Sequence, residues 1–215
     1  MTQVIEIDAV VVGAGFGGLH ALHRLRAAGF TVQGVEAGSD VGGTWYWNRY
    51  PGARCDVESL AYSYSFTSEI DSEWRWTERY ATQPEIQSYL RFISERLRLR
   101  DLIRFGTRVT AASYDEIAHR WLITLDDGDQ ISARFCLLAT GPLTSPIVPD
   151  VPGLAEFKGT ICHTARWPEV DPDFSGQRVG VIGTGSSGTQ LIPKVAEQAE
   201  QLIVFVRTPN FTVPA

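Results

Sequence analysis

The pattern of apolar and polar positions at the start of the chain predicts a strand, a helix and a second strand. The β-branched run at 7–12 predicts a strand that is buried on both faces of a parallel sheet. Leucines three residues apart fall on one stripe of a helix over about 15–28, and residues 31–36 predict a second strand. Such a unit favours parallel pairing of its strands through a right-handed crossover.

The middle of the chain follows a different pattern, a helix and then a β-meander. Residues 84–100 predict a helix, because their apolar positions share one face. Residues 104–138 predict a meander in which strands at 121–125 and 130–135 flank an Asp-Gly turn. The run 136–142 predicts a further strand that stops at a Gly-Pro pair.

A second strand–helix–strand pattern appears near the end of the sequence. Residues 178–182 and 202–206 predict its strands, and residues 186–200 predict its helix. Residues 142–178 hold six of the eleven prolines and predict a linker before this unit. Two parallel strands and one helix cannot bury both faces of a sheet, so we expect a second domain that is cut short.

Composition narrows the class of protein without identifying it. The 215 residues are 44% hydrophobic and 20% charged, with a net charge of −6, values typical of a soluble globular protein. An acidic chain without a Lys/Arg run is a poor candidate for binding nucleic acid or an anionic membrane. No apolar run reaches the roughly 18 residues of a membrane span, and no secretory signal is visible, so we expect a cytoplasmic protein.

The three cysteines argue against a cross-linked or metal-bound fold. Their number is odd and they form no C-x-x-C pair, so a disulfide framework or a structural zinc site is not expected. The sequence gives no other indication of a metal site.

The first glycine motif, G-x-G-x-x-G at 13–18, follows the first strand and begins the first helix. Glu36 lies at the end of the next strand, 18 residues beyond Gly18. This context predicts a dinucleotide site, because glycines allow the backbone to approach a pyrophosphate at the helix N-terminus. The Glu36 carboxylate can accept hydrogen bonds from ribose hydroxyls and would repel a 2′-phosphate. The alternative is a glycine-rich turn beside a surface glutamate.

The second glycine motif, at 183–188, has the same context but ends its second strand on Arg207 rather than on an acid. A guanidinium at this point suits a 2′-phosphate. The two motifs therefore predict two different dinucleotides, FAD at the first and NADPH at the second. The alternative for Arg207 is a solvated arginine at the end of a strand.

Two further segments belong with these motifs. Residues 38–68 are rich in Gly, Trp and Tyr without a clean period, and they predict an ordered loop that faces a ligand. Three large aromatic residues beside Gly42 and Gly43 suit stacking on a flat ring, with Arg54 and Asp56 close by, although an aromatic core loop is the alternative. Residues 138–141 predict a strand end that returns to the first nucleotide site.

Residues 157–168 carry a long and specific resemblance. They match F-x-G-x-x-x-H-T-x-x-W-P, the signature of type I Baeyer–Villiger monooxygenases, directly before the second glycine motif. The run at 42–56 also resembles that family, and its phenylacetone and steroid monooxygenase branch most of all. The resemblance covers essentially the whole chain.

The resemblance implies an α/β fold with two Rossmann-like dinucleotide-binding domains, the first containing the meander and the second truncated. The expected parts are an FAD-binding domain, a linker with the signature, and the start of an NADP-binding domain, at 1–141, 142–178 and 179–215. His163 of the linker would couple domain movement to turnover, and an imidazole hydrogen-bonded inside the linker is also expected.

The resemblance assigns FAD to residues of both the glycine turn and the aromatic loop. The expected FAD-binding residues are Gly13, Gly15, Phe16, Gly18, Glu36, Gly43, Thr44, Trp45, Tyr46, Trp47, Asp56, Tyr62, Val109, Thr140 and Gly141. NADP(H) is assigned to the second turn and its strand end. The expected residues there are Thr184, Gly185, Ser186, Ser187, Gly188, Thr189, Gln190, Arg207 and Thr208.

The implied reaction uses NADPH to reduce FAD and O₂ to form a C4a-peroxyflavin, which adds to a ketone and gives an ester or lactone. Arg54 and Asp56 are the candidate catalytic residues, with Asp56 positioning an arginine that the family carries beyond residue 215. The missing C-terminal portion of the same enzyme is therefore the expected partner. A flavin-dependent N- or S-oxygenase and a non-catalytic FAD-binding fragment are the alternatives.

Overall fold

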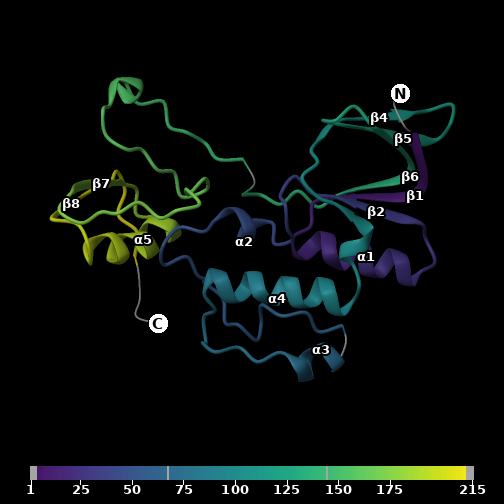
Figure 1. Cartoon of the computed structure of the whole chain (residues 1–215), viewed down its shortest axis with the longest axis horizontal. Coiled ribbons are helices and arrows are strands. Elements are labelled where there is room, and N and C mark those ends of the chain that lie inside the picture. Colours follow the sequence, from purple (N-terminus) through teal and green to yellow (C-terminus); the bar gives the residue numbers. More distant parts are fainter. Residues whose placement is uncertain (1–3, 67, 144, 212–215) are drawn as a thin grey trace. The chain divides into compact units, whose positions relative to one another are not determined.

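A computed structural model describes residues 4–66, 68–143 and 145–211, and it divides into two compact units (Figure 1). The first unit comprises residues 1–47 and 86–145, and the second comprises residues 48–85 and 146–215. The two chain segments of each unit are far from each other in the sequence, so long-range contacts hold each unit together.

A mixed six-stranded sheet forms the first unit, in the order β3-β2-β1-β6-β5-β4. β1 pairs in parallel with β2 and β6, β2 pairs in parallel with β3, and the meander β4-β5-β6 is antiparallel. The strands are β1 (Val4–Val12), β2 (Val32–Val35), β3 (Ile103–Arg104), β4 (Val109–Asp115), β5 (Arg120–Leu125) and β6 (Gln130–Leu138). This is the Rossmann-like α/β arrangement that the first strand–helix–strand pattern predicts.

Helices α1 (Phe16–Ala27), α2 (Thr44–Trp47) and most of α4 (Gln83–Arg96) complete the first unit, and the 3₁₀ turn Arg100–Leu102 precedes β3. Leu19 and Leu22 of α1 are fully buried, as are Ile86, Leu90 and Ile93 of α4. The apolar stripes of both helices therefore face the core, as their spacing predicts.

The helix α4 ends at Arg96, whereas the sequence predicts an end at residue 100. Arg98 has φ +49°, and the Leu99 N–H donates to the Ser94 carbonyl at 2.7 Å. This is a Schellman-type ending formed without glycine. The Arg26 guanidinium also donates to the Leu97 and Arg98 carbonyls, which stabilises the ending from α1.

The strands predicted at 130–135 and 136–142 are one strand, β6, which ends at Leu138. It pairs in parallel with β1 from Val4 opposite Gln130 to Val12 opposite Leu138. Because the neighbouring strand offers an unbroken edge of hydrogen-bonding groups, β6 continues where its own sequence pattern changes.

The second unit contains β7 (Arg178–Ile182), α5 (Ser186–Ala196) and β8 (Gln201–Phe205), together with α3 (Ser68–Glu73) and the 3₁₀ turn Leu154–Glu156. The strands β7 and β8 are parallel, and α5 covers one face of the pair. The core combines Tyr50, Ala53, Trp167, Leu191 and Val195. A two-stranded sheet with one helix is not a domain by itself, and a second Rossmann-like domain is not evident.

The helix α5 is also shorter than predicted, ending at Ala196 rather than at residue 200. Ala199 forms a bridge with Ser175, and the Glu200 N–H donates to the Gln177 carbonyl at 3.0 Å. Pairing with the segment before β7 therefore replaces the last helical turn. No helix of the described residues has the length and apolar character needed to cross a membrane.

Candidate functional site

The first glycine turn connects β1 to α1 with little space between their backbones. Gly13 has φ +104°, and its N–H donates to the Val35 carbonyl at 2.8 Å. A Cβ on Gly18 would overlap the Gly13 carbonyl, so only glycine allows α1 to lie this close to the turn. Gly15 is the N-cap and provides no side-chain cap, which leaves the first-turn N–H groups suited to an anion.

Glu36 at the end of β2 stabilises the same turn. Only 5% of this residue is exposed, and its Oε2 and Oε1 accept hydrogen bonds from the Ala14 and Gly38 N–H groups, both at 2.7 Å. A carboxylate has about four lone-pair sites, so two remain for ribose hydroxyls.

The loop 38–43 lies directly against the first turn. The Gly42 N–H donates to the Ala14 carbonyl at 3.0 Å, and a Cβ on Gly43 would come within 2.9 Å of the Gly15 Cα. At this contact the two backbones meet through glycines, with no side chain of Gly15 or Gly43 between them. Such a surface fits the phosphates and ribose of a dinucleotide.

The aromatic run after Gly43 forms the single turn α2. Trp45 is 9% exposed and belongs to the core, in keeping with the alternative that the aromatic run builds a core loop. Tyr46 packs edge-on against Trp47 at 4.8 Å between ring centroids, and its hydroxyl lies 2.9 Å from the Ser39 Oγ. Thr44 begins this turn. The segment is thus an ordered loop held by its own rings.

Two other segments reach the first turn. A Cβ on Gly13 would lie 2.5 Å from the Ala139 carbonyl oxygen, so the end of β6 touches the turn directly before Thr140 and Gly141. The Thr107 N–H donates to the Glu36 carbonyl at 3.0 Å, which brings the start of β4 and Val109 to the end of β2. Phe16, the first residue of α1, packs against Tyr89 at 6.2 Å.

The second glycine turn repeats the geometry of the first. Gly183 has φ +98°, and its N–H donates to the Phe205 carbonyl at 2.9 Å. A Cβ on Gly188 would overlap the Gly183 carbonyl, as Gly18 would overlap Gly13. Gly185 is the N-cap of α5 and again provides no side-chain cap, and Ser186 begins the helix.

The strand end beside this turn is open and polar. Arg207 and Thr208 follow β8 and are exposed. The Asn210 side chain donates to the Thr184 carbonyl at 2.6 Å, and the Thr189 hydroxyl donates to the same carbonyl at 3.2 Å. Asn210 is a residue that sequence reasoning misses, since nothing in its local pattern indicates a contact 26 residues away.

Gln190 of α5 joins the second turn to the candidate catalytic pair. Its Oε1 accepts from the Tyr50 hydroxyl at 2.9 Å and the Arg54 N–H at 3.2 Å. Its Nε2 donates to the Arg54 carbonyl at 3.1 Å and the Asp56 Oδ1 at 2.9 Å. The structure therefore brings Gln190, Arg54 and Asp56 together within the second unit.

The side chain of Arg54 points to another acid. Its Nη1 lies 3.2 Å from Glu78 Oε2, in an ion pair that is about half exposed at both ends. Asp56 is exposed, and Tyr62 is half-buried in the same unit. Whether Asp56 and Tyr62 contact FAD, as the resemblance implies, stays a prediction.

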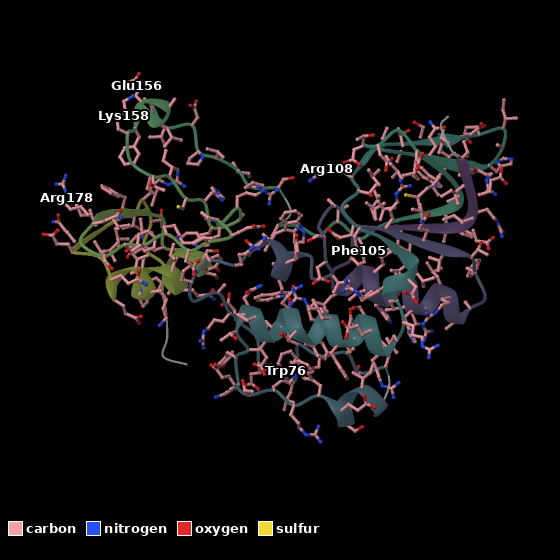
Figure 2. All side chains as sticks on the ribbon, in the orientation of Figure 1. Trp76, Phe105, Arg108, Glu156, Lys158 and Arg178 are labelled. Atoms are coloured by element: carbon pink, nitrogen blue, oxygen red, sulfur yellow. The ribbon has the colours of Figure 1, made fainter. Side chains whose placement is uncertain are left out.

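The signature residues have structural roles in the second unit. Trp167 is 6% exposed in the core, and its indole donates to Asp171 at 2.7 Å. The Nδ1 of His163 accepts from the Ala165 N–H at 3.1 Å, which leaves its Nε2 to donate to the Ile147 carbonyl at 3.3 Å. Glu156, directly before the signature, and Lys158, its second residue, are exposed (Figure 2).

Asp40 and Gln87 hold the loop 38–43 in place, and sequence reasoning misses both. Asp40 accepts hydrogen bonds from Arg91 and Arg100, both at 2.6 Å, and Gln87 Nε2 donates to the Val41 carbonyl at 2.5 Å. Burial raises the pKa of Asp40, but hydrogen bonds from the Arg100 and Arg91 guanidinium groups and the Val41 N–H outweigh it and hold the pKa below its usual range. No group of three or more His, Cys, Asp or Glu in the described residues could hold a metal ion.

Two glycine turns of matching geometry, each between a strand and the helix that follows it, are typical of dinucleotide-binding folds. The chain belongs to the flavin-binding monooxygenase-like family, whose model matches residues 7–213. Within this family it corresponds to the N-terminal portion of the type I Baeyer–Villiger monooxygenases.

Three relatives, each named as a monooxygenase, are similar to this chain along nearly its whole length. The chain is 47% identical over 210 residues to a Baeyer–Villiger monooxygenase of Pseudooceanicola batsensis, covering 97% of this chain and 38% of the relative. It is 45% identical over 211 residues to the phenazine N-monooxygenase PhzNO1 of Lysobacter antibioticus, covering 98% of this chain and 39% of the relative. A solved structure of oxidized steroid monooxygenase bound to NADP matches with TM-score 0.93 and 59% identity, over 98% of this chain and 40% of that one. The chain therefore spans about two fifths of the length of these relatives.

Proposed function

We propose that the chain is the N-terminal part of an FAD- and NADPH-dependent monooxygenase that converts ketones to esters or lactones with O₂. The observation that carries the proposal is a contrast between two turns of the same backbone geometry. The strand that follows the first turn and its helix leads to the buried carboxylate of Glu36, and the corresponding strand after the second turn leads to the exposed guanidinium of Arg207. A carboxylate accepts ribose hydroxyls, whereas a guanidinium pairs with a 2′-phosphate.

FAD fits the first turn, because the α1 N-terminus has no side-chain cap and its N–H groups suit a pyrophosphate, while Gly15 adds no side chain that would block it. Glu36 would accept the ribose hydroxyls of its ADP half. Val109, Thr140 and Gly141 would border the same nucleotide, and Thr44, Trp45, Tyr46 and Trp47 would lie along the flavin. When bound, FAD supplies the redox chemistry and NADPH the hydride.

NADP(H) fits the second turn for the same physical reason. The N–H groups of Ser186, Ser187 and Gly188 belong to the first turn of α5, where the pyrophosphate would bind. Arg207 and Thr208 would contact the 2′-phosphate. The Asn210 contact with Thr184 would keep the turn in place around the nucleotide.

Arg54 and Asp56 would supply charge at the reacting end of the nicotinamide. Both are fixed at their backbone or carboxylate by Gln190, and Arg54 is oriented further by Glu78. A fixed charge stabilises a reacting group without reorganising during the reaction, which is the main electrostatic contribution of such sites. Asp56 would act as a positioning residue for an arginine from the rest of the enzyme.

The remainder of the enzyme would complete the second domain. Ile182, Ile203 and Phe205 lie on the face of β7 and β8 opposite α5, and they are 70%, 45% and 55% exposed. We propose the C-terminal portion of the same enzyme as the partner that covers this face. The proposed parts are an FAD-binding domain, a linker and the start of an NADP-binding domain, at 1–141, 142–178 and 179–215.

The complete enzyme containing this sequence tests the proposal directly. Purified protein should be yellow, oxidise NADPH, and form an ester or lactone from a cyclic or aryl ketone under air, as detected by gas chromatography. A flavin spectrum without ketone-dependent product would contradict the proposed reaction, while the absence of bound flavin would contradict the assignment of the first turn.

A flavin-dependent N- or S-oxygenase is the second candidate, and the identity to a phenazine N-monooxygenase favours testing it. The same preparation should be offered a ketone, a phenazine and a thioether in parallel. Oxygen transfer to nitrogen or sulfur alone would replace the proposed function with this one. A yellow protein that never oxidises NADPH would indicate a non-catalytic flavin-binding protein.

A further inference from the structure

The side-chain amide of Gln190 uses its whole hydrogen-bonding capacity on one segment. Its oxygen accepts two hydrogen bonds, from the Tyr50 hydroxyl and the Arg54 N–H, and its nitrogen donates two, to the Arg54 carbonyl and Asp56. A glutamine side chain offers two acceptor sites and two N–H donors, so none is left over. Rotating the amide by half a turn would place its NH₂ against the Arg54 N–H, so the orientation is fixed.

The segment 50–56 is attached to α5 at other points as well. Tyr50 is 7% exposed in the core with Leu191 and Val195, and burial raises the pKa of its phenol. The Ser187 side chain, in the first turn of α5, lowers the pKa of the same phenol, although burial outweighs this effect. A Cβ on Gly52 would overlap the Gln190 carbonyl, so the backbone itself touches the helix.

These contacts form a continuous path inside the second unit. It begins in α5, whose first turn would bind the proposed nucleotide, and passes through Gln190 of the same helix to Tyr50, Arg54 and Asp56. The contacts of the Gln190 side chain are all hydrogen bonds, and Gln190 is the residue of α5 that they connect to Arg54 and Asp56.

We propose that Gln190 is a positioning residue that couples the nucleotide-binding turn of α5 to the geometry of Arg54 and Asp56. The proposal rests on the proposed function of these residues. Both N–H groups of the amide are already engaged, so Gln190 contributes to turnover through the segment 50–56 rather than as a ligand of the pyrophosphate.

The complete enzyme provides the test, with Gln190→Leu to remove all four hydrogen bonds and Gln198→Leu as the matched control. Gln198 is an exposed glutamine just beyond the end of α5. Because the hydrogen bond from Gln190 Nε2 to the Asp56 carboxylate is charge-assisted, we expect Gln190→Leu to lower kcat for ester formation about tenfold or more. The KM for NADPH should change less than about twofold, and more NADPH should be consumed per ester formed.

Gln190→Glu tests the donor half of the amide separately from its acceptor half. A carboxylate can still accept from Tyr50 and the Arg54 N–H, but it faces Asp56 and the Arg54 carbonyl with an acceptor. We expect this variant to fold like the wild type and, as with Gln190→Leu, to form less ester per NADPH consumed. If both variants raise the KM for NADPH but form as much ester per NADPH as the wild type, the proposal is overturned and Gln190 is a pyrophosphate ligand.

Hydrogen exchange gives a readout that is independent of ester formation. Mass spectrometry should show the amide of Arg54 exchanging about tenfold faster in Gln190→Leu than in the wild type, with or without NADP⁺. Added NADP⁺ should slow exchange over 50–56 in the wild type and in Gln198→Leu, but not in Gln190→Leu. Equal protection of the segment in all three proteins would refute the coupling, even if the wild type forms no ester.

Discussion

At the scale of single residues, two adjacent glycines of α1 face very different surroundings. A Cβ on Gly18 would overlap the Gly13 carbonyl, whereas a Cβ on Gly17 would meet only the Ala139 Cβ at 3.9 Å. We therefore expect Gly18→Ala to lower the free energy of unfolding by about 2–3 kcal/mol, as overpacking against a fixed backbone does. Gly17→Ala should leave it unchanged or raise it by up to about 1 kcal/mol, because alanine favours a helix.

Urea denaturation of the two variants and the wild type measures this difference. Both substitutions add one methyl group to the same turn of the same helix, so they serve as controls for each other. Equal midpoints for Gly17→Ala and Gly18→Ala would show that α1 can move away from β1, and the close contact would then not explain the motif.

Arg207 carries the expected choice between the two nicotinamide cofactors. Its guanidinium is exposed just after β8, where the fingerprint of the second turn expects the 2′-phosphate. In the complete enzyme, Arg207→Ala should raise the KM for NADPH about tenfold or more and change the KM for NADH little, because only NADPH loses a charge-assisted contact.

Arg178→Ala is the matched control for this prediction. Arg178 is an exposed arginine at the first residue of β7, at the end of the strand away from the turn (Figure 2). Steady-state kinetics with both cofactors should leave its KM values near those of the wild type. A similar loss with NADPH and NADH in Arg207→Ala would exclude the 2′-phosphate role.

At the scale of elements, α4 and the 3₁₀ turn after it hold the loop 38–43 against the first glycine turn. Asp40 accepts hydrogen bonds from Arg91 of the helix and Arg100 of the 3₁₀ turn, and Gln87 donates a hydrogen bond to the Val41 carbonyl. Asp40→Asn should lower the free energy of unfolding by about 1 kcal/mol, since both arginines are partly exposed. It should also weaken FAD binding, which flavin fluorescence would measure.

The pH dependence of this difference follows from the lowered pKa of Asp40. A group whose pKa is depressed in the folded state stabilises it above the unfolded pKa, and this contribution is lost as the pH falls through the folded pKa. The stability difference between wild type and Asp40→Asn should therefore be full near about pH 7 and shrink below about pH 4. Glu95→Gln, an exposed position of α4, is the control; a difference that is constant with pH would exclude the Asp40 pairs as its cause.

The sequence predicts elements well where the periodicity is local, and less well where another element decides. The stripes of α1 and α4 and both glycine turns follow from spacing alone. The end of α4 depends on Arg26 and on the unusual φ of Arg98, and the length of β6 depends on pairing with β1. Neither partner can be read from the segment itself.

The candidate site shows the same division. Glu36 is predicted because its role follows from its place after a strand and a glycine motif. The other roles arise from contacts between residues far apart in the sequence. Asp40 meets Arg91 over 51 residues, Tyr50 meets Gln190 over 140 residues, and Gln190 meets Arg54 over 136 residues. Motifs therefore indicate which groups meet a ligand, while the residues that position those groups need the fold.

At the scale of the whole molecule, the two faces of the β7–β8 pair are unequal. Val179 and Leu202 pack with α5 in the core of the second unit, whereas Ile182, Ile203 and Phe205 lie on the opposite face. Alternate residues of a strand point to opposite faces, so this second face is a continuous apolar surface. Uncovered apolar faces of a sheet associate with other apolar surfaces.

The isolated chain of residues 1–215 is therefore expected to behave differently from the complete enzyme. It should bind FAD through the first unit, because all the contacts of that glycine turn lie within this unit, yet form no ester. It should also self-associate through the face that contains Ile203, and Ile203→Thr should reduce this association while keeping a β-branched residue in β8. Light scattering after size-exclusion chromatography, the flavin spectrum and NADPH oxidation measure the three properties on one sample. If the isolated chain is monomeric and oxidises NADPH with ketone at the rate of the complete enzyme, then the exposed face is native surface and residues 1–215 already contain the whole catalytic apparatus.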